Sequence, residues 1–363
     1  MKHKKRKVAV GLSGGVDSSV AAALLRERGY DVTGLSMQIY NKSFPVNGYG
    51  KNACYGPNEE EDIRSAARVC KDLGIPFHVI DLKKEFEDHV IRYFRREYLK
   101  GRTPNPCVVC NHRLKFGFLL SSAKKSGIDF DFFATGHYAR VVQSDGRFLL
   151  KRALDRAKDQ TYFLYALTPG QLSRTIFPLG EYQKKEVKAR ARALHLKTFE
   201  RAESQDFITG GDYTALFAEN EIQEGDIVND KGEVLGRHRG IIHYTIGQRR
   251  GIGIARSRPL YVTGVDAGNN RLVVGERGAL FSKGLIAGDV NLISVDRFET
   301  SCKATVKIRQ QHREAHATIF PYQNQQVRVL FDEQQMSVTP GQSAVFYQGD
   351  TLLGGGIIER AIS

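Results

Sequence analysis

A seven-residue segment, Ser13–Ser19, constrains the fold more than any other part of the chain. It has the sequence Ser-Gly-Gly-Val-Asp-Ser-Ser, follows the apolar run Val8–Leu12 and leads into the amphipathic stretch Val16–Arg28. Adjacent glycines let backbone N–H groups approach an anion without a Cβ in the way, and a helix N-terminus adds partial positive charge. The segment therefore predicts a strand, a phosphate-binding turn and a helix, in that order.

Three side chains of this loop are candidates for direct roles. The hydroxyls of Ser13 and Ser18 can donate to a phosphate. Asp17 is a poor phosphate partner because both groups are anionic, so we expect it either to hold Mg²⁺ against the phosphates or to cap the helix. The loop is neither a Walker loop, which would end in Gly-Lys-Ser/Thr, nor a Gly-x-Gly-x-x-Gly dinucleotide turn. An ordinary glycine turn capped by serines is the alternative interpretation.

The first half of the chain predicts an α/β fold with a doubly wound parallel sheet. Short β-rich runs alternate there with amphipathic stretches, from residue 7 to about residue 194. The expected strands are Val8–Leu12, Val32–Met37, Phe77–Ile80 and Phe130–Thr135. The expected helices are Val16–Arg28, Glu59–Leu73 and the helical stretch His112–Lys125.

The second half predicts mostly β structure. Glycine-punctuated runs such as Gly225–Val228, Gly232–Gly236 and Leu260–Val265 are typical of short strands. The alternating runs Ala304–Ile308 and Ala344–Tyr347 suit a small barrel of the kind that binds RNA. We therefore expect three domains, over residues 1–205, 206–285 and 286–363.

Composition favours a polyanionic partner. The chain has 54 Lys and Arg against 40 Asp and Glu, a net charge of +14, so nucleic acid is the leading candidate and a basic surface without a ligand is the alternative. No stretch approaches the roughly 20 apolar residues of a membrane helix. The basic start Met1–Lys7 leads directly into a strand, without a signal-peptide core. We expect a cytoplasmic monomer that does not enter a membrane.

The cysteines indicate reactive or metal-binding thiols in a reducing compartment, because they form an odd set in a large chain. They are Cys54, Cys70, Cys107, Cys110 and Cys302. The segment Gly101–Asn111 contains two prolines and a Cys-x-x-Cys ahead of an expected helix. There the helix dipole and the cations of Arg102, Arg113 and Lys115 would favour a thiolate, which makes Cys110 a candidate nucleophile.

Other interpretations of the Cys-x-x-Cys pair stay open. It can be half of a zinc site or part of an iron–sulfur site, although no second Cys-x-x-Cys completes a four-thiolate zinc cage. Inert buried cysteines are the remaining alternative, and we favour that interpretation for Cys70 and Cys302.

Five blocks in a fixed order identify a family resemblance. The blocks are Ser13–Ser19, Thr103–Asn111, Ala134–Arg140, Lys158–Leu164 and Tyr244–Arg249. The first resembles the signature of PP-loop ATP pyrophosphatases, which cut ATP between the α and β phosphates to adenylate an oxygen. Together the blocks closely resemble the tRNA-specific 2-thiouridylases, over most of the 363 residues.

The resemblance implies a fold and an activity. It implies a PP-loop domain, a small central domain and a C-terminal β-barrel. It implies ATP-dependent 2-thiolation of the wobble uridine of tRNAs for Lys, Glu and Gln, with Mg²⁺ accompanying the ATP. Sulfur would come from a donor such as a cysteine desulfurase or a sulfur relay protein.

The resemblance also implies site residues. ATP would be bound by Gly11, Leu12, Ser13, Gly14, Gly15, Val16, Asp17, Ser18, Met37 and Gly136. Cys110 would be the catalytic thiol beside the target base, flanked by Asn105 and Pro106, with Cys107 and Asp17 as further catalytic candidates. tRNA contacts would come from His137, Lys158, Asp159, Gln160, Arg309 and Gln342.

Two departures from the family pattern affect the sulfur chemistry. Cys107 stands where the commoner pattern has Asp. The pattern also has a second catalytic cysteine after a Ser-Gln-Asp stretch, whereas here Ser204–Asp206 leads directly into Phe207–Gly210 without one. This chain must therefore handle sulfur differently.

Two hypotheses follow. In the first, Cys107 and Cys110 are the redox pair, one bearing a persulfide and the other resolving it by thiol exchange. In the second, Cys107, Cys110 and Cys54, in the loop Asn52–Gly56, bind a [4Fe-4S] cluster whose open iron holds sulfide. We favour the cluster slightly, since three thiolates leave one iron free, and related tRNA-thiolating PP-loop enzymes resemble this arrangement. A loop cysteine without a role is the alternative for Cys54.

Competing functions remain at this point. Another PP-loop ligase or amidotransferase would share the ATP loop but would need no paired thiols. A catalytically inactive tRNA-binding homologue is the alternative outside enzymes, and the intact Ser13–Ser19 loop argues against it.

Overall fold

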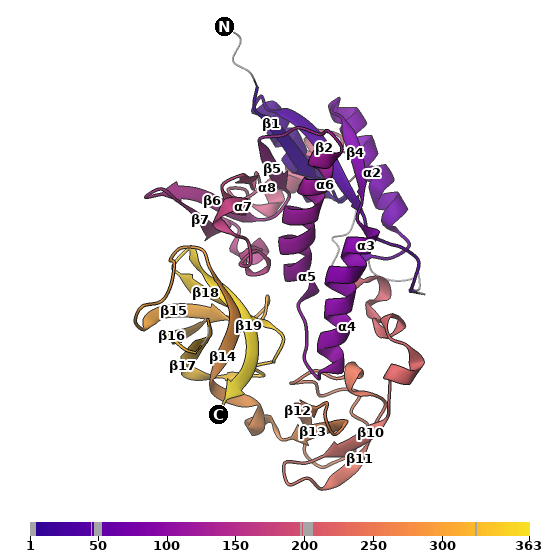
Figure 1. The fold of residues 1–363 in the computed structure, drawn as a ribbon, viewed down its shortest axis with the longest axis vertical. Coiled ribbons are helices and arrows are strands. Elements are labelled where there is room, and N and C mark those ends of the chain that lie inside the picture. The colour runs from indigo at the N-terminus through magenta and orange to yellow at the C-terminus, as the bar shows by residue number, and fades with distance from the viewer. Residues whose placement is uncertain (1–4, 45, 47–52, 197, 199–205, 324) are drawn as a thin grey trace. The chain divides into compact units, whose positions relative to one another are not determined.

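The computed structural model describes residues 5–44, 46, 53–196, 198, 206–323 and 325–363. The chain forms two compact units (Figure 1). The first unit comprises Met1–Val90, Cys107–Tyr213 and Asp350–Leu352, and the second comprises Ile91–Pro106, Thr214–Gly349 and Leu353–Ser363. Ser204 and Gln205, where the family pattern leads toward its second cysteine, lie outside the described residues.

The first unit contains a five-stranded parallel sheet with the order β4-β2-β1-β5-β8. Its strands are β1 (Lys7–Gly11), β2 (Asp31–Gln38), β4 (Phe77–Asp81), β5 (Phe132–Thr135) and β8 (Thr175–Ile176). All four predicted strands are confirmed, and β8 is additional. Strand order reverses between β1 and β5, and such switch points open a crevice at the carboxyl ends of the strands.

The core of this unit lies where α1 (Val16–Glu27), α2 (Glu59–Leu73) and α8 (Lys184–Ala193) pack with the sheet. Val20, Leu24 and Ala66 share this core with Cys70, which is 1 % exposed. A Cβ on Gly34 would lie 2.5 Å from the Cys70 sulfur. Cys70 is therefore a buried core residue, as predicted, and burial raises its pKa to about 12.

One long helical segment begins at Pro106. It comprises α5 (Pro106–Val109), a π-helical stretch η2 (Cys110–Phe118) and α6 (Leu119–Lys125). Proline suits the first helical position because its missing N–H would have no partner there. The prediction that the helix begins near His112 was therefore wrong, since both cysteines of the Cys-x-x-Cys pair already lie inside it.

The remaining elements of the first unit are short. Strand β3 (Ala53–Tyr55) pairs in parallel with β9 (Asp206–Ile208), and β6 (Ala139–Ser144) forms a hairpin with β7 (Arg147–Arg152). The other helices are α3 (Lys83–Phe86), a π-helical turn η1 (Glu87–Ile91) and α7 (Pro169–Leu172). Among the described residues, 3₁₀ turns include η3 (Arg156–Lys158), η4 (Thr161–Phe163), η6 (Thr209–Gly211), η7 (Thr214–Leu216), η8 (Glu219–Glu221), η9 (Ile241–His243) and η10 (Arg277–Leu280).

The second unit is mostly β, as predicted. It contains α4 (Arg92–Leu99) and a four-stranded sheet with the order β11-β10-β13-β12. The strands of this sheet are β10 (Gly225–Val228), β11 (Val234–His238), β12 (Tyr261–Asp266) and β13 (Arg271–Gly275). Ile227, Val262 and Leu272 form its apolar core with Tyr244 and Ile252.

A six-stranded barrel completes the second unit. Its order is β14-β17-β16-β15-β18-β19, and β14 also pairs with β19, which closes the sheet and removes its edges. The strands are β14 (Phe281–Leu292), β15 (Cys302–Lys307), β16 (Ala315–Pro321), β17 (Val327–Met336), β18 (Ser343–Gln348) and β19 (Thr351–Ile362). The predicted α/β fold with a mostly-β region and a C-terminal barrel is therefore confirmed.

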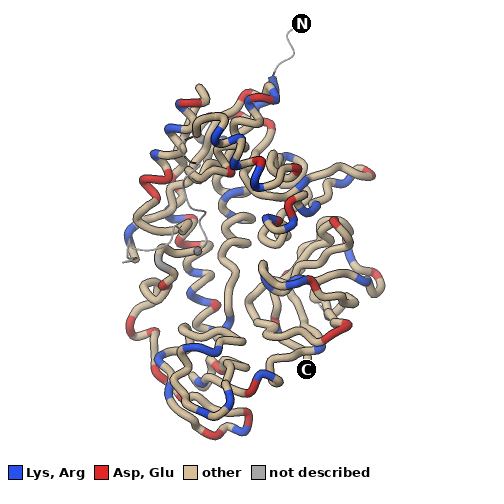
Figure 2. The backbone as a smooth tube through the Cα atoms, turned by 180° about the vertical axis from the view of Figure 1, so that it is seen from behind, with Lys and Arg blue, Asp and Glu red and all other residues tan. Residues whose placement is uncertain are grey.

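Charge is spread rather than concentrated. Figure 2 shows Lys and Arg along the whole described chain, interspersed with Asp and Glu, so the net charge of +14 does not belong to one segment. Within the described residues, no helix has the length and apolar character needed to cross a membrane.

Candidate functional site

The predicted phosphate loop lies at the switch point of the parallel sheet. Leu12 follows β1, and its N–H donates to the Leu35 carbonyl at 2.8 Å, while its own carbonyl accepts from Ser36 Oγ at 2.7 Å. Gly14 then has a positive φ of 73°, a conformation that favours glycine. These hydrogen bonds fix the start of the loop at the end of β1, and the loop connects β1 to the first turn of α1.

Serine hydroxyls hold this loop together. The Ser13 N–H donates to Ser18 Oγ at 3.3 Å, and the Ser13 and Ser18 hydroxyls lie 3.4 Å apart. Ser18 Oγ and Ser19 Oγ both donate to the Gly15 carbonyl, at 3.2 and 2.8 Å. Gly15 is the N-cap of α1 and has no side chain with which to cap the helix. The first-turn amides of α1 therefore suit an anionic ligand.

Asp17 does not cap α1, because it is the second helical residue after the N-cap Gly15. The helix-capping interpretation of Asp17 was therefore wrong. Both of its carboxylate oxygens accept from Lys184 Nζ at 2.7 Å, and Oδ1 also accepts from the Tyr138 hydroxyl at 2.9 Å. Because both carboxylate oxygens already accept hydrogen bonds, Asp17 does not suit the role of a Mg²⁺ ligand.

Gly136 borders the loop from the neighbouring strand. It follows β5, and a Cβ added to it would lie 2.6 Å from the Ser18 nitrogen and 2.7 Å from the Asp17 carbonyl carbon. Only glycine fits so close to the first turn of α1. Met37 lies near the end of β2 and is half-buried. The structure therefore brings the predicted ATP residues of β1, β2 and β5 to one edge of the sheet.

Cys107 and Cys110 lie on one side of the helical segment, since three residues correspond to about one helical turn. Both are half-buried free thiols. Burial raises the pKa of Cys107 to about 12 and that of Cys110 to about 11. The prediction of a favoured thiolate was therefore wrong, because loss of solvent outweighs the nearby cation.

Lys115 is the cation that does favour charged thiols here, and it lowers the pKa of both Cys107 and Cys110. In the π-helical stretch η2, hydrogen bonds join residues five apart, which places Lys115 one turn beyond Cys110. The other two expected cations differ: Arg102 forms an ion pair with Glu97 at 2.8 Å, and Arg113 is exposed. The π-helical register was not foreseen from the sequence.

Cys54 is exposed on β3, and its charge raises the pKa of Cys107 and of Cys110. The three thiols of the cluster hypothesis are therefore close enough to influence one another. Among the described residues, however, no group of three or more His, Cys, Asp and Glu side chains is arranged to hold a metal ion. The arrangement does not fit a preformed iron–sulfur site, and the cluster stays a prediction.

The segment that leads into this helix is held within the second unit. Gln342 Nε2 donates to the carbonyls of Thr103 and Pro104, at 3.1 and 3.2 Å. The Thr103 N–H donates to the Pro340 carbonyl at 2.9 Å. Asn105 is 8 % exposed and precedes Pro106. Gln342, predicted to contact tRNA, thus uses its amide to position the segment before the cysteines.

Arg309, another predicted tRNA contact, likewise donates to protein oxygens. Its guanidinium lies 2.7 Å from Thr339 Oγ1, 3.0 Å from the Ser337 carbonyl and 3.2 Å from the Ile246 carbonyl. The side chain therefore joins the chain after β15 to the turn before β18.

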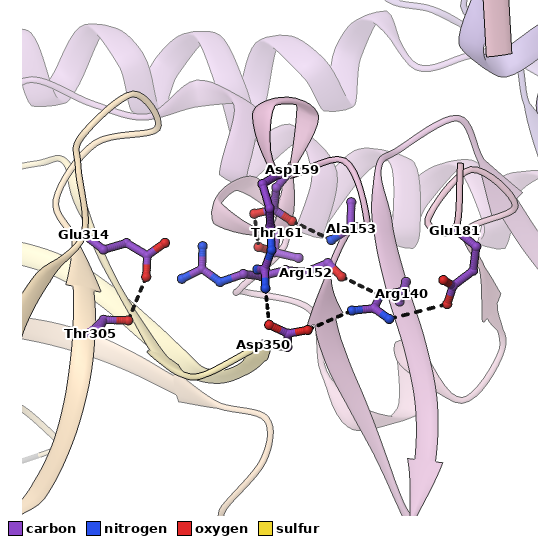
Figure 3. A network of polar contacts seen from close by, with 10 residues as sticks. Arg140, Arg152, Ala153, Asp159, Thr161, Glu181, Thr305, Glu314 and Asp350 are labelled. Carbon is purple, nitrogen blue, oxygen red and sulfur yellow. Dashed lines mark hydrogen bonds and ion pairs between the residues drawn. The ribbon is translucent and has the colours of Figure 1, made fainter. Parts of the chain in front are cut away.

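The predicted tRNA contacts in the first unit have different surroundings. Asp159 is 4 % exposed, and its two oxygens accept from the Ala153 N–H at 3.0 Å and from Thr161 Oγ1 at 2.7 Å (Figure 3). The Asp159 carboxylate is therefore buried and engaged within the protein, and a tRNA contact by this residue stays a prediction. Gln160 Oε1 accepts from the Tyr138 N–H at 2.9 Å, and Lys158 is half-buried.

His137 is half-buried beside the helical segment. Its Nδ1 lies 2.7 Å from Thr135 Oγ1, and its ring packs near Phe116 and Phe177. Burial, and then the charge of Lys115, hold the pKa of His137 well below its usual range. His137 is therefore neutral near pH 7 and cannot supply positive charge to an RNA phosphate.

A network at the β6–β7 hairpin was not foreseen (Figure 3). Arg140 Nε donates to the Arg152 carbonyl at 2.6 Å, and its guanidinium lies 3.2 Å from Asp350 and 3.6 Å from Glu181. Arg156 also pairs with Asp350 and, as the larger cause, lowers its pKa. These arginines are paired within the unit. No local sequence pattern could predict this ion-pair network, since Asp350 lies 210 residues from Arg140.

Comparison with known proteins identifies the family. A model described as the tRNA methyl transferase HUP domain matches residues 6–209, which is more than half of the chain. Models described as the tRNA methyl transferase PRC-barrel domain and the aminomethyltransferase beta-barrel domain match residues 216–276 and 282–358.

Similar full-length proteins share one name, tRNA-specific 2-thiouridylase MnmA. The chain is 47 % identical to the one from Acetivibrio thermocellus, over 98 % of this chain and 99 % of that protein. It is 47 % identical to the one from Geotalea uraniireducens, over 99 % of this chain and 97 % of that protein. It is 45 % identical to one from Clostridium perfringens, over 99 % of each chain. With the phosphate loop at the switch point and the paired cysteines, these matches lead to one conclusion: the chain belongs to the family of tRNA-specific 2-thiouridylases.

Proposed function

We propose that this protein replaces the 2-oxygen of the wobble uridine, position 34, of tRNA with sulfur, using ATP. The observation that carries the proposal is the combination, in one unit, of an uncapped glycine loop at the sheet's switch point with Cys107 and Cys110 on one side of a helix. An anion site suits the phosphates of ATP. Paired thiols suit sulfur transfer.

The reaction needs an activated oxygen, because a carbonyl oxygen is a poor leaving group. The uridine 2-oxygen attacks the α-phosphate of ATP and pyrophosphate leaves. A sulfur nucleophile then attacks carbon 2 of the base, and AMP leaves with the former 2-oxygen. The amides of the loop Leu12–Gly15 and of the first turn of α1 would stabilise the phosphate charge. Since Asp17 does not fit as a metal ligand, we assign no step to Mg²⁺, which would enter with ATP.

The sulfur nucleophile is proposed to be a persulfide on Cys110, with Cys107 as the partner thiol. A persulfide donor, such as a cysteine desulfurase or a sulfur relay protein, would load it. The terminal sulfur would attack the base, and the Cys107 thiolate would then attack the Cys110 sulfur, releasing the thiolated base and leaving a disulfide. A dithiol reductant would restore the pair.

The proposed substrates are the anticodon stem-loops of tRNAs for Lys, Glu and Gln. The excess of Lys and Arg suits this polyanion. Lys158, Asp159 and Gln160 remain the predicted tRNA contacts of their block, and Arg309 and Gln342 are proposed to act near the RNA through the segments that they position. We propose that the protein works in the cytoplasm as a monomer.

The test is thiolation by the purified chain of a tRNA transcript, with ATP and a persulfide donor. We expect 2-thiouridine by nucleoside mass spectrometry, with AMP and pyrophosphate released in equal amounts. Cys110→Ser should abolish 2-thiouridine, while the control Cys302→Ser, a half-buried thiol at the start of β15, should retain it. Thiolation by Cys110→Ser at the wild-type rate would contradict the proposal.

Iron analysis of anaerobically purified protein separates the persulfide from the cluster. The persulfide route predicts an iron-free protein that thiolates tRNA. About four irons per chain, lost in Cys54→Ala, Cys107→Ala and Cys110→Ala but kept in Cys302→Ala, would instead establish the cluster and displace the persulfide route.

A further inference from the structure

Lys184 has an ammonium group buried beside the phosphate loop. Its Nζ lies 2.7 Å from both carboxylate oxygens of Asp17 and 5.6 Å from the centroid of the Tyr138 ring. Lys184 is 9 % exposed and Tyr138 is 1 % exposed. The ammonium group is therefore largely withdrawn from water, while the Asp17 side chain keeps 28 % exposure, and the ion pair connects the first residue of α8 to the first turn of α1.

The stability and capping of α8 do not explain why a lysine occupies its first position. A cation at the N-terminus of a helix is opposed by the helix dipole. Other groups already satisfy this end, since Gln183 and Glu186 form a capping box and the Lys184 N–H donates to Asp155 Oδ2 at 2.9 Å. A buried ion pair also contributes little stability compared with a well-packed apolar pair. The interaction with the Asp17 carboxylate therefore explains why a lysine stands at this position.

Asp17 creates the need for a compensating charge. It lies between the glycines of the loop and Ser18, whose hydroxyl closes the loop onto Ser13 and Gly15. An uncompensated carboxylate here would repel a bound triphosphate and weaken the anion site. The turn cannot move aside, because the backbone of Gly136 lies against Asp17 and Ser18.

We propose that Lys184 is a positioning residue of the ATP site, which neutralises Asp17 and fixes the first turn of α1 so that the loop amides meet the phosphates. Lys184 acts on ATP through Asp17. The inference rests on the proposed use of ATP by this protein.

The test is ATP affinity, measured by isothermal titration calorimetry on the full chain without tRNA. Lys184→Met should weaken ATP binding by roughly tenfold or more, because it leaves Asp17 unpaired beside the phosphates. Lys184→Arg should restore most of the affinity. The double variant Asp17→Asn, Lys184→Met should bind ATP more tightly than Lys184→Met alone, because it removes the repelling charge. Lys185→Met, an exposed neighbour on α8, is the matched control and should bind as the wild type does.

Thermal unfolding of each variant separates a loss of folding from a loss of binding. If Lys184→Met does not fold, the double variant carries the comparison, and its ATP affinity should stay within about threefold of the wild type. Wild-type ATP affinity in Lys184→Met would overturn the inference. So would a double variant whose ATP affinity is about tenfold or more below that of the wild type. A wild-type chain that binds no ATP would overturn the proposed function as well, so the two failures are distinguishable.

Discussion

At the residue scale, burial sets the protonation of the two helix thiols. Lys115 favours the charged form of both thiols, but loss of solvent is the largest effect on the pKa of each cysteine. Near pH 7 Cys107 and Cys110 are therefore neutral. Since the thiolate is the nucleophile in sulfur exchange, each thiol must lose its proton before it attacks a persulfide or a disulfide.

The raised pKa of Cys110 predicts the pH dependence of its alkylation. Only the thiolate reacts with iodoacetamide, so the rate should rise roughly tenfold per pH unit from about pH 7 to pH 10, below the pKa. The rate should level off only near pH 11, where the pKa lies. Peptide mass spectrometry after timed quenching measures the rate at Cys110 alone. A plateau near pH 8 would show instead that the cations outweigh burial.

Other single residues explain where prediction from sequence succeeded and failed. The strand–glycine–helix order around Ser13–Ser19 is local, so the phosphate loop could be predicted from it, whereas Gly136 was proposed only from the family resemblance. The contact of Asp17 with Lys184 joins residues 167 positions apart, and no local pattern encodes it. Asp159 lies in a family block but is buried, and one sequence cannot separate a residue that supports a loop from one that contacts a ligand.

At the element scale, the turn Pro340–Gln342 supports the segment before the helix that begins at Pro106. Gly341 has a φ of +90°, and a Cβ there would lie 2.8 Å from the Thr103 carbonyl oxygen, so the turn is packed against the segment. Gln342 adds two hydrogen bonds to the Thr103 and Pro104 carbonyls. The segment contains two prolines, which have no N–H to donate, so its position depends on such contacts.

Gln342→Ala tests this support. Removing both hydrogen bonds leaves two carbonyls without this partner, and the free energy of unfolding should fall by about 1–3 kcal/mol. Thiolation should fall more than ATP affinity, because the segment leads to Cys107 and not to the phosphate loop. Urea denaturation, calorimetry with ATP and the thiolation assay measure the three effects, with Gln348→Ala, an exposed residue at the end of β18, as the control. Equal thiolation by both variants would mean that the turn does not position the cysteines.

Elements also differ in how far the sequence predicts them. Four strands of the parallel sheet are short apolar runs whose bounds agree within two residues with the prediction, whereas the two-residue strand β8 was not predicted. The start of the helical segment that contains the two cysteines was predicted near His112, whereas it begins at Pro106, because proline is favoured at the first position of a helix. No pattern in the sequence of Cys110–Phe118 distinguishes a π-helix from an α-helix, so the π-helical stretch was not predicted.

At the scale of the whole molecule, charge is the property that the proposed function uses most. The chain has a net charge of +14, yet many arginines are paired within a unit, such as Arg95 with Glu221 and Arg140 with Asp350. Pairing lowers the number of cations that can meet RNA phosphates. The net excess still favours a polyanion, because unlike charges cancel and the surplus of Lys and Arg remains.

This excess predicts a strong salt dependence of tRNA binding. Each RNA phosphate neutralised by Lys or Arg releases counterions, so the logarithm of the affinity should fall linearly with the logarithm of the salt concentration. We expect a loss of at least about tenfold between about 50 and 200 mM potassium chloride, measured by filter binding of labelled tRNA. The thermal unfolding midpoint, followed over the same range, controls for loss of folded protein. An affinity that does not change with salt would mean that tRNA is held without phosphate contacts, so that the surplus of basic residues serves some other purpose than RNA binding.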